Sequence, residues 1–592
     1  MVDPRDEYTR RLARWDAAIA HGDRTHSHFA NLRLADAGAA IVVGWAAFAH
    51  IVNWWWLAAP AIVFLILVIA HDRVLKGIER SRRARGLYER GLARMDGTWP
   101  GSGPDGARFG EGQPVAGDLD LFGPASLFQL LSTARTEVGE ETLASWLQQG
   151  ADIGEVRERQ AAVGELRDLM DFREAVAVTA TEVAVARTGR LAAWARVPAD
   201  GFPRAAHVAF IFGAVGSAVA VLAALIGWLP FSLLLAWGLV PGGLAAIWVR
   251  RTLAALAGVD KAADDLALLR VLLERIEAQR FQSPRLIALH GVLAGTGEPA
   301  SRAIARLERL VATLDSCRNQ MFLPIAILFM VPSQLAVMID RWRSVHGAAV
   351  EGWLRAVGQC EALASLATYA FEHPADPFPT LEDATPLLDA ADLGHPLLVE
   401  SVAVRNDVHL GDTGPHVLMV SGSNMSGKST LLRTVGVNVV LALAGAPVRA
   451  SRMRLSRLAL GTSLRVEDSL QEGHSRFYAE ILRIRSVVDI ARGSVPALFL
   501  LDEILGGTNS HDRRIGAEAI VRGLAKAGAI GLVTTHDLAL TELVSALGVP
   551  AANVHFEDRL EDGRMIFDYR MRPGVVEHSN ALALMRAVGL DV

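Results

Sequence analysis

The feature that most constrains this 592-residue chain is a glycine-bearing stretch, GSNMSGKS, at residues 422–429. It follows a short apolar run at 417–420 and precedes a helical pattern that begins near Leu431. Strand, loop and helix in this order fit the pattern G-x-x-x-x-G-K-[ST], in which backbone N–H groups surround a phosphate chain at a helix N-terminus. The pattern therefore predicts an α/β nucleotide-binding domain in the C-terminal part of the chain.

The loop residues have expected roles in holding a nucleotide. Gly422 and Gly427 leave the backbone room to approach the phosphates, Lys428 would bond the β/γ oxygens, and Ser429 would hold Mg²⁺. The predicted cofactors are therefore ATP and Mg²⁺. The predicted nucleotide-binding residues of this loop are Gly422, Ser423, Asn424, Met425, Ser426, Gly427, Lys428, Ser429 and Thr430.

Two later strand ends carry further polar residues. One apolar run ends in Asp502 and Glu503, and the next ends in His536. A carboxylate at a strand end can hold Mg²⁺, and the next carboxylate can polarise the attacking water. We therefore expect Asp502 to serve the metal with Ser429, and we expect Glu503, His536 and Lys428 to be catalytic, with His536 sensing the γ-phosphate. This order is typical of an ABC-type P-loop ATPase with a parallel-sheet core, which works at a dimer interface.

Composition bounds the remaining possibilities. Hydrophobic residues make up 51% of the chain and the mean hydropathy is +0.27, so membrane segments are to be sought. The net charge of −5 gives no strong basic field for nucleic acid. Cys317 and Cys360 are the only cysteines, which excludes a disulfide framework and suits a reducing compartment.

Two apolar blocks are candidates for membrane hairpins. Residues 37–70 are divided at 53–56 (NWWW) into arms that each span roughly 21–23 Å, short against a ~30 Å core, so a thin hairpin and a shallow re-entrant pair both remain open. Residues 207–249 are divided near Pro230 into arms of roughly 20 residues, enough to cross. The competing interpretation is buried helices of a soluble protein. A third apolar stretch, 321–339, leaves two interpretations open, contact with the membrane or a buried helix, and its prolines and polar residues favour a buried, kinked helix.

Charge placement predicts the topology. Arginines flank both blocks, and neither turn carries a charge. By the positive-inside rule all large segments would face the cytoplasm. We therefore expect a multi-pass protein of the inner (cytoplasmic) membrane with its ATPase domain in the cytoplasm.

A family resemblance becomes specific around the glycine-bearing loop. Residues 421–450 resemble the P-loop region of MutS-family mismatch repair ATPases, through Asn424-Met425, Arg433 and the sequence AGAPVRA at 444–450. The Asp-Glu segment is similar to the family's, except that Leu505-Gly506 stands where Gly-Arg is usual and Asn509 where Ser is usual. The resemblance implies that Thr508, Asn509 and Ser510 reach the nucleotide of a partner subunit, so a homodimer is expected. Residues of the next motif that fall at matching places are Asp468, Ser469, Gly473, Ser475, Phe477 and Glu480.

The resemblance extends upstream and has gaps. Residues 393–398 (LGHPLL) and 405–407 (RND) resemble the family's entry into the ATPase domain, and 118–168 resembles the start of its helical core, or lever. The family's mismatch-reading domain carries a Phe-x-Glu wedge, and Phe109-x-Glu111 and Phe172-x-Glu174 match it by letters only. We therefore expect a membrane-associated branch that lacks this N-terminal domain, with the second hairpin in place of the DNA clamp.

These observations predict a domain order and a ranked set of functions. The first is a membrane-anchored MutS-like ATPase whose lever moves on ATP binding, with an unknown protein partner. The alternative is a DNA-binding mismatch repair protein, and the second alternative is an ABC-type half-transporter, although QEGHSRF stands where transporters carry an LSGGQ-like helix. The predicted segments are 1–36, a charged cytoplasmic segment; 37–72, membrane hairpin 1; 73–117, a basic helix and Gly-rich linker; 118–204, the first part of an all-α core; 205–250, transmembrane hairpin 2; 251–385, the second part of the core; and 386–592, the ATPase domain.

Overall fold

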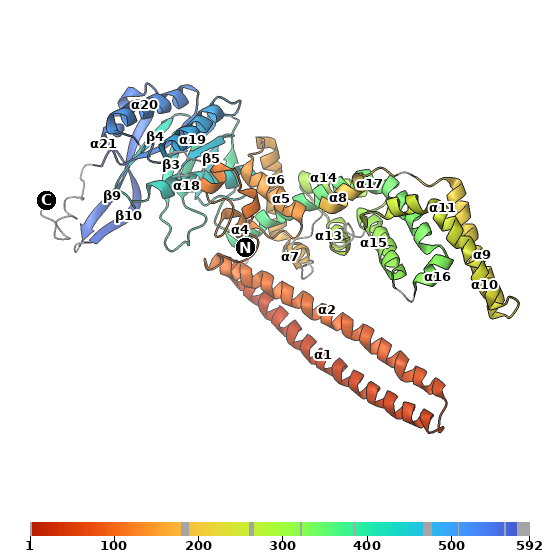
Figure 1. Ribbon diagram of the computed structural model, residues 1–592. Coiled ribbons are helices and arrows are strands. Elements are labelled where there is room, and N and C mark those ends of the chain that lie inside the picture. The colour runs from red at the N-terminus through yellow and green to blue at the C-terminus, as the bar shows by residue number, and fades with distance from the viewer. Residues whose placement is uncertain are drawn as a thin grey trace.

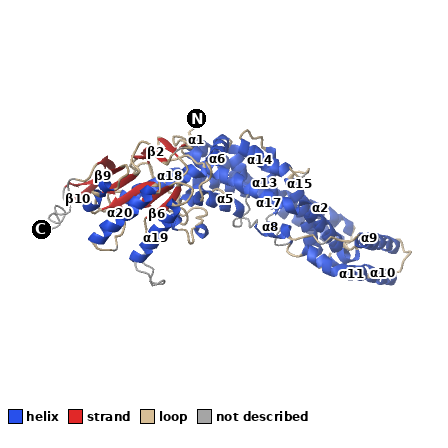
Figure 2. Ribbon diagram, turned by 90° about the horizontal axis from the view of Figure 1, so that it is seen from above, coloured by secondary structure: helices blue, strands red, loops and turns tan. Residues whose placement is uncertain are grey.

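The computed structural model is elongated and mostly helical, with two mixed sheets in the C-terminal region (Figure 1). The sheets lie at one end, and two helical hairpins extend away from them toward the other end in both views (Figure 2). The structure describes residues 3–178, 189–199, 201–259, 266–295, 297–319, 322–383, 385–465, 476–506, 508–561 and 564–576.

The N-terminal hairpin consists of α1 (Pro4–Phe48) and α2 (Ala58–Met95), joined through the short 3₁₀ helix η1 (Trp54–Leu57). Asp3 caps α1, and the Asn53 side chain accepts a hydrogen bond from Trp55 N at 3.1 Å, so the turn falls where the sequence predicted it. The helices run far beyond the predicted arms, and the expected boundaries at 36/37 and 72/73 fall inside single helices.

The second hairpin pairs α9 (Arg204–Leu225) with α10 (Phe231–Trp237) and α11 (Leu239–Leu256). Its turn lies at the predicted Pro230, which precedes the first residue of α10 and whose ring fixes φ at the start of that helix. Three helical stretches among the described residues have the length and composition to cross a membrane: Trp54–Met95, Arg204–Leu225 and Phe231–Leu256. The hairpin shapes are thus present, and their placement in a membrane stays a prediction.

Helices fill the middle of the molecule around one long helix, α17 (Val331–Glu372), which packs against α5, α6, α8, α14 and α15. The Thr136 hydroxyl accepts a hydrogen bond from Gly139 N and so caps α5. The other helices of this region are η2 (Ala107–Phe109), α3 (Pro114–Asp118), α4 (Leu127–Leu131), α5 (Glu137–Gln148), α6 (Ile153–Asp168), α7 (Met170–Val178), α8 (Gly189–Arg196), α13 (Leu266–Ala278), α14 (Pro284–Ala294), α15 (Ala300–Cys317) and α16 (Leu323–Leu328).

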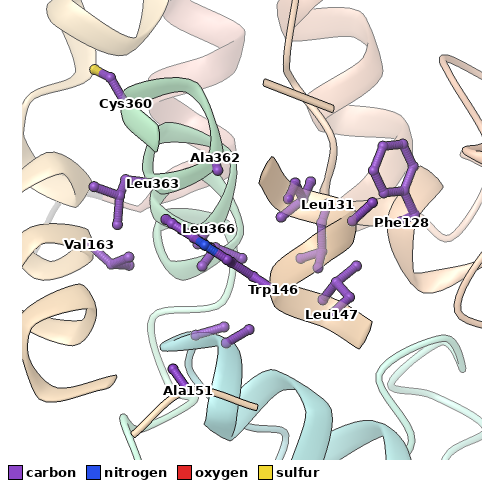
Figure 3. Close-up of a cluster of buried hydrophobic side chains, with 14 of the residues drawn as sticks. Phe128, Leu131, Trp146, Leu147, Ala151, Val163, Cys360, Ala362, Leu363 and Leu366 are labelled. Atoms are coloured by element: carbon purple, nitrogen blue, oxygen red, sulfur yellow. The ribbon is translucent and has the colours of Figure 1, made fainter. Parts of the chain in front are cut away.

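One large hydrophobic core joins this helical region to the sheets. Figure 3 shows part of it, where Trp146 of α5 lies beside Leu366 of α17. The guanidinium of Arg159 stacks 3.9 Å from the Trp146 ring centroid, which lets a buried cation contact an aromatic face. Because the core is continuous, α17 is joined to the domain that carries the glycine-bearing loop through α5 and α6, which pack against both.

Two expectations about this region are wrong. The predicted Gly-rich linker is folded, since Trp99 is 5% exposed and Gln148 donates a hydrogen bond to Phe109 O at 2.6 Å. The apolar stretch 321–339 is not a buried helix. It is divided into α16 and the start of α17 at Met330, whose φ is +54°, and several of its apolar side chains are exposed.

The C-terminal region contains two sheets. The larger has the order β10-β9-β4-β8-β7-β6, in which all neighbours are parallel except β9 and β10, so the predicted parallel core is present. The smaller has the order β1-β5-β2-β3. The strands are β1 (Thr380–Leu381), β2 (Leu387–Leu393), β3 (Asn406–Gly411), β4 (Val417–Ser421), β5 (Arg452–Leu455), β6 (Ala459–Ser463), β7 (Ala497–Leu501), β8 (Ile530–Thr535), β9 (Ala551–Glu561) and β10 (Arg564–Pro573), and the helices are α18 (Lys428–Ala444), α19 (Arg476–Ala491), α20 (Ser510–Lys526), α21 (Leu538–Thr541) and α22 (Leu543–Ala546).

Candidate nucleotide site

The glycine-bearing loop connects β4 to α18 at the edge where parallel strands end. Lys428 begins α18, and its ammonium donates hydrogen bonds to Gly422 O at 2.9 Å and Ser423 O at 2.8 Å. These bonds close the loop around the lysine at the N-terminus of α18. An open helix N-terminus beside a lysine favours an anion such as phosphate.

Two glycines of this loop have backbone angles that other residues rarely adopt. Gly422 has φ +147°, and a Cβ on it would lie 2.8 Å from Ser426 Oγ. Gly427 has φ +105°, and a Cβ on it would lie 3.1 Å from the Tyr569 ring. The absence of side chains therefore lets the loop curve as tightly as it does.

The loop offers polar atoms that fit a phosphate and its cation. The hydroxyl oxygens of Ser423 and Ser426 are buried and have no hydrogen-bond partner within the described part of the chain. A buried hydroxyl without a partner is costly, and phosphate oxygens or a hydrated cation would satisfy it. Ser429, the predicted magnesium ligand, lines a cavity beside the loop.

Asp502 and Glu503 follow β7, next to β8 in the sheet. Thr534 of β8 joins the two, because its hydroxyl donates to Asp502 Oδ1 and accepts from Glu503 N at 2.9 Å. The turn is tight, with φ of +48° at Glu503 and +55° at Leu505. This backbone shape explains why a glycine suits the Leu505 position, and the leucine here instead packs into the core beside β7.

His536 lies beside Glu503 at the end of β8. Its Nδ1 is 3.5 Å from Glu503 Oε1, and the two side chains are 49% and 37% exposed. Burial lowers the pKa of Lys428, while the carboxylates of Glu503 and Asp502 act against that shift. The predicted catalytic residues are therefore close together at one end of the sheet. Lys428 interacts electrostatically with Glu503 and Asp502, and His536 lies beside Glu503.

A cavity of about 600 Å³ opens next to the loop, within the size range of small-molecule sites. Asn424, Met425, Gly427, Lys428, Ser429, Thr430 and Glu503 line it among the predicted residues. Asp502 and His536 are not among the described residues that line the cavity. The cavity is long enough to extend from the loop to the segment that follows β2.

The far side of the cavity is formed by residues to which the sequence assigned no role. His395 and Asn406 come from the two motifs read only as a domain entry, and Tyr569 comes from β10. The Asn406 amide donates to Tyr569 O at 3.0 Å and its oxygen accepts from Met571 N at 2.7 Å, which joins the start of β3 to β10 within this side of the cavity. Burial and Arg433 lower the pKa of His395 to about 4, so its ring is neutral at pH 7. No local sequence pattern around Tyr569 indicates that it lines a nucleotide site.

The remaining predicted residues are placed only in part. Asn509 caps α20, because its side-chain oxygen accepts from Asp512 N at 2.9 Å. Thr508 precedes it and Ser510 begins α20, and neither is among the described residues that line the cavity. Asp468, Ser469, Gly473 and Ser475 lie outside the described residues, whereas Glu480 accepts a hydrogen bond from Leu505 N.

A second set of charges attaches the helical region to this site. Asp118 is 1% exposed and accepts from Thr462 Oγ1 at 2.7 Å, from Arg465 N at 3.0 Å and from Arg483 Nη1 at 3.0 Å. Asp120 pairs with Arg433 of α18 and with Arg465. The start of the helical core is therefore bonded directly to the helix that carries Lys428.

The fold and the site together define an α/β domain whose parallel strands end at a loop-and-helix anion site. Residues 418–591 match the family model for MutS domain V. This match confirms the resemblance to MutS-family proteins in the C-terminal region of the chain.

Individual relatives agree with this match. The chain is 35% identical over 193 residues to the DNA mismatch repair protein MutS of Brevibacillus brevis, covering 31% of this chain and 22% of that protein. It is 32% identical over 267 residues to the DNA mismatch repair protein MutS of Natronomonas pharaonis, covering 42% and 30%. It is 34% identical over 205 residues to the endonuclease MutS2 of Thermomicrobium roseum, covering 33% and 24%. The chain thus spans less than a third of the length of these relatives.

Proposed function

We propose that this chain is an ABC-type P-loop ATPase of the MutS kind, which binds and hydrolyses ATP with Mg²⁺. The observation that carries the proposal is that Lys428, Ser429 and Glu503 line one cavity at the N-terminus of α18. Lys428 would exchange its two carbonyl partners for the β/γ-phosphate oxygens, where its charge balances the charge of the leaving ADP.

Glu503 is the general base of the proposed reaction. Its backbone is held by Thr534, and its carboxylate faces the cavity beside His536. The carboxylate would accept a proton from a water that attacks the γ-phosphorus, while His536 contacts the departing phosphate. Mg²⁺, held by Ser429 and by waters on Asp502, would neutralise the phosphate charge.

Two chains would close on each other around ATP. The start of α20, from Thr508 to Ser510, is the part of each chain that would reach the nucleotide of its partner. Closure would be passed to the helical region through α17. That helix ends at Glu372, and Asp376 just beyond it pairs with Arg449 at 3.3 Å, whose backbone N–H bonds to Asn438 of α18 at 2.8 Å.

Two candidates exist for what the ATPase drives. The first is DNA-binding mismatch repair, which the names of the relatives favour over membrane anchoring. The matched residues lie in the ATPase region, and both Phe-x-Glu phenylalanines are engaged in packing. Phe109 contacts Phe122 and Phe128, and Phe172 contacts Phe281 with ring centroids 5.5 Å apart. A DNA-binding form of this chain would therefore use another surface.

The second candidate is an ATPase anchored in the cytoplasmic membrane. Its supporting observation is the set of three long apolar helices, whose side chains are largely exposed. Exposed apolar surfaces of this extent fit lipid better than water. Trp54, Trp55 and Trp56 at one hairpin tip and Trp228 at the other suit a membrane interface.

The deciding experiment is the steady-state ATPase rate of the purified full-length protein, with and without homoduplex and mismatched DNA, across a salt series. A rate that changes with mismatched DNA and loses that response as salt rises supports the DNA candidate. A measurable rate that is indifferent to DNA supports the membrane candidate. Lack of any Mg²⁺-dependent hydrolysis would refute the ATPase proposal itself.

A further inference from the structure

The residues that follow α15, through α16 to the first turns of α17, form an apolar segment with an unusual surface. From Phe322 to Ile339 the chain has no charged residue, and Phe322, Leu323, Ile325, Ile327 and Met338 are 40–51% exposed. Asp340 and Arg341 follow at once. An exposed apolar strip that ends sharply at charged residues is typical of a segment that contacts something other than water.

This segment is attached to the second hairpin. The Ser217 hydroxyl of α9, which is fully buried, donates to Leu328 O at 2.6 Å and accepts from the Trp237 indole at 3.1 Å. Met330 is 1% exposed and packs with Phe210, and a Cβ on Gly213 would lie 2.4 Å from its sulfur. The small residues on α9 thus create the space into which the segment fits.

The break between α16 and α17 frees backbone carbonyls, and side chains satisfy two of them. Ser217 bonds to the Leu328 carbonyl, and the Gln334 amide donates to Phe329 O at 3.0 Å. Irregular backbone is tolerated at membrane depth only where protein groups satisfy it in this way. An ordinary surface turn would need neither bond, because water would supply them.

The position of these contacts sets the depth of the segment. Ser217 is 13 residues along α9 from Arg204, about 20 Å at 1.5 Å per residue, and a hydrocarbon core is ~30 Å thick. The other end returns to the base of the hairpin, where Gly201 N donates to Asp340 Oδ2 at 3.1 Å. A hairpin that spans the bilayer therefore carries this segment well inside it.

We propose that residues 322–338 form a re-entrant membrane segment, whose exposed side chains contact lipid acyl chains beside the second hairpin. This inference rests on the membrane-anchored candidate described above. It makes α17 one uninterrupted helix of about 63 Å, from the interior of the bilayer to the residues that adjoin α18. Movement of the ATPase domain would then act directly on a membrane-embedded segment.

The test uses single spin labels on the full-length protein in lipid nanodiscs, with Cys317 and Cys360 replaced by alanine. Ile325→Cys reports the proposed segment. Val219→Cys on α9 is the lipid-facing reference, and Val345→Cys, 62% exposed on α17 beyond Asp340, is the water-facing reference. The measured quantity is the ratio of collision rates with oxygen and with a water-soluble nickel chelate.

The expected result is a ratio at position 325 that equals the ratio at 219 and exceeds that at 345 several-fold. A water-like ratio at 325 with a lipid-like ratio at 219 would overturn the re-entrant segment and leave the hairpin in the membrane. Water-like ratios at both would refute the membrane anchoring on which the inference rests. Spin–spin broadening between two 325 labels would assign the face to a second copy of the chain and likewise overturn the proposal.

Discussion

Replacing Gly422 with alanine tests whether the loop geometry is what binds the nucleotide. The substitution places a Cβ 2.8 Å from Ser426 Oγ and 3.1 Å from Phe556 O, at a φ of +147° that an alanine rarely adopts. A residue forced into such a backbone region costs about 1–3 kcal/mol. If the loop relaxes to remove that strain, ATP loses the phosphate contacts, so the affinity for ATP is expected to fall about 5- to 150-fold.

The assay is the equilibrium dissociation constant of a fluorescent ATP analogue with Mg²⁺. The matched control is Gly523→Ala on α20, where a Cβ meets nothing within 4 Å and a helical φ is kept, so its affinity should equal that of the wild type. A wild-type dissociation constant for G422A in a folded protein would refute the argument that this loop surrounds the phosphates.

Three further predictions concern binding, pH and stability. Lys428→Ala should abolish detectable binding of the same analogue, because no other ammonium in the described cavity wall faces the phosphates. Burial raises the pKa of Glu361 from 4.5 to about 7, so the folded protein holds that proton more tightly than the unfolded chain does. The stability that results is lost as pH rises from about 4.5 to 7. Glu361→Gln should therefore flatten the fall of the thermal midpoint with pH across this window, and an unchanged slope would contradict the assignment. Glu372→Gln leaves Arg94, which is 8% exposed, without its charge partner and should lower the free energy of unfolding by about 3–5 kcal/mol, measured as a lower thermal midpoint. Glu89→Gln, which removes one partner of the half-exposed pair with Arg85, should change the thermal midpoint little.

The loop and the strand ends could be predicted from the sequence because their signals are local. A five-residue apolar strand, two glycines and a lysine specify one geometry, and Asp502, Glu503 and His536 follow buried strands directly. Parallel strands end at the same edge, so residues far apart in the chain come together without further information. The turns of both hairpins were local signals too, through Asn53 and Pro230.

Other features depend on contacts between residues that lie far apart in the sequence. Tyr569 reaches the cavity only because β10 pairs with β9 and Asn406 bonds to its carbonyl. The sequence of α1 does not predict its full length, because its polar half is stabilised by α2 rather than by an apolar stripe of its own. In the segment at 321–339, prolines and polar residues favour a kinked core helix, whereas in the structure Ser217 and Gln334 accommodate the break between α16 and α17.

The most direct test of the proposed ATPase is single-turnover hydrolysis by the full-length wild-type protein and its Glu503→Gln variant, with ATP and Mg²⁺ at saturating protein. The wild type should release phosphate. The variant should bind ATP with unchanged affinity and hydrolyse it about 10²- to 10⁴-fold more slowly, because the amide cannot accept the proton of the attacking water. Hydrolysis by the variant at the wild-type rate would contradict the assignment of Glu503, and the absence of hydrolysis by the wild type would contradict the account as a whole.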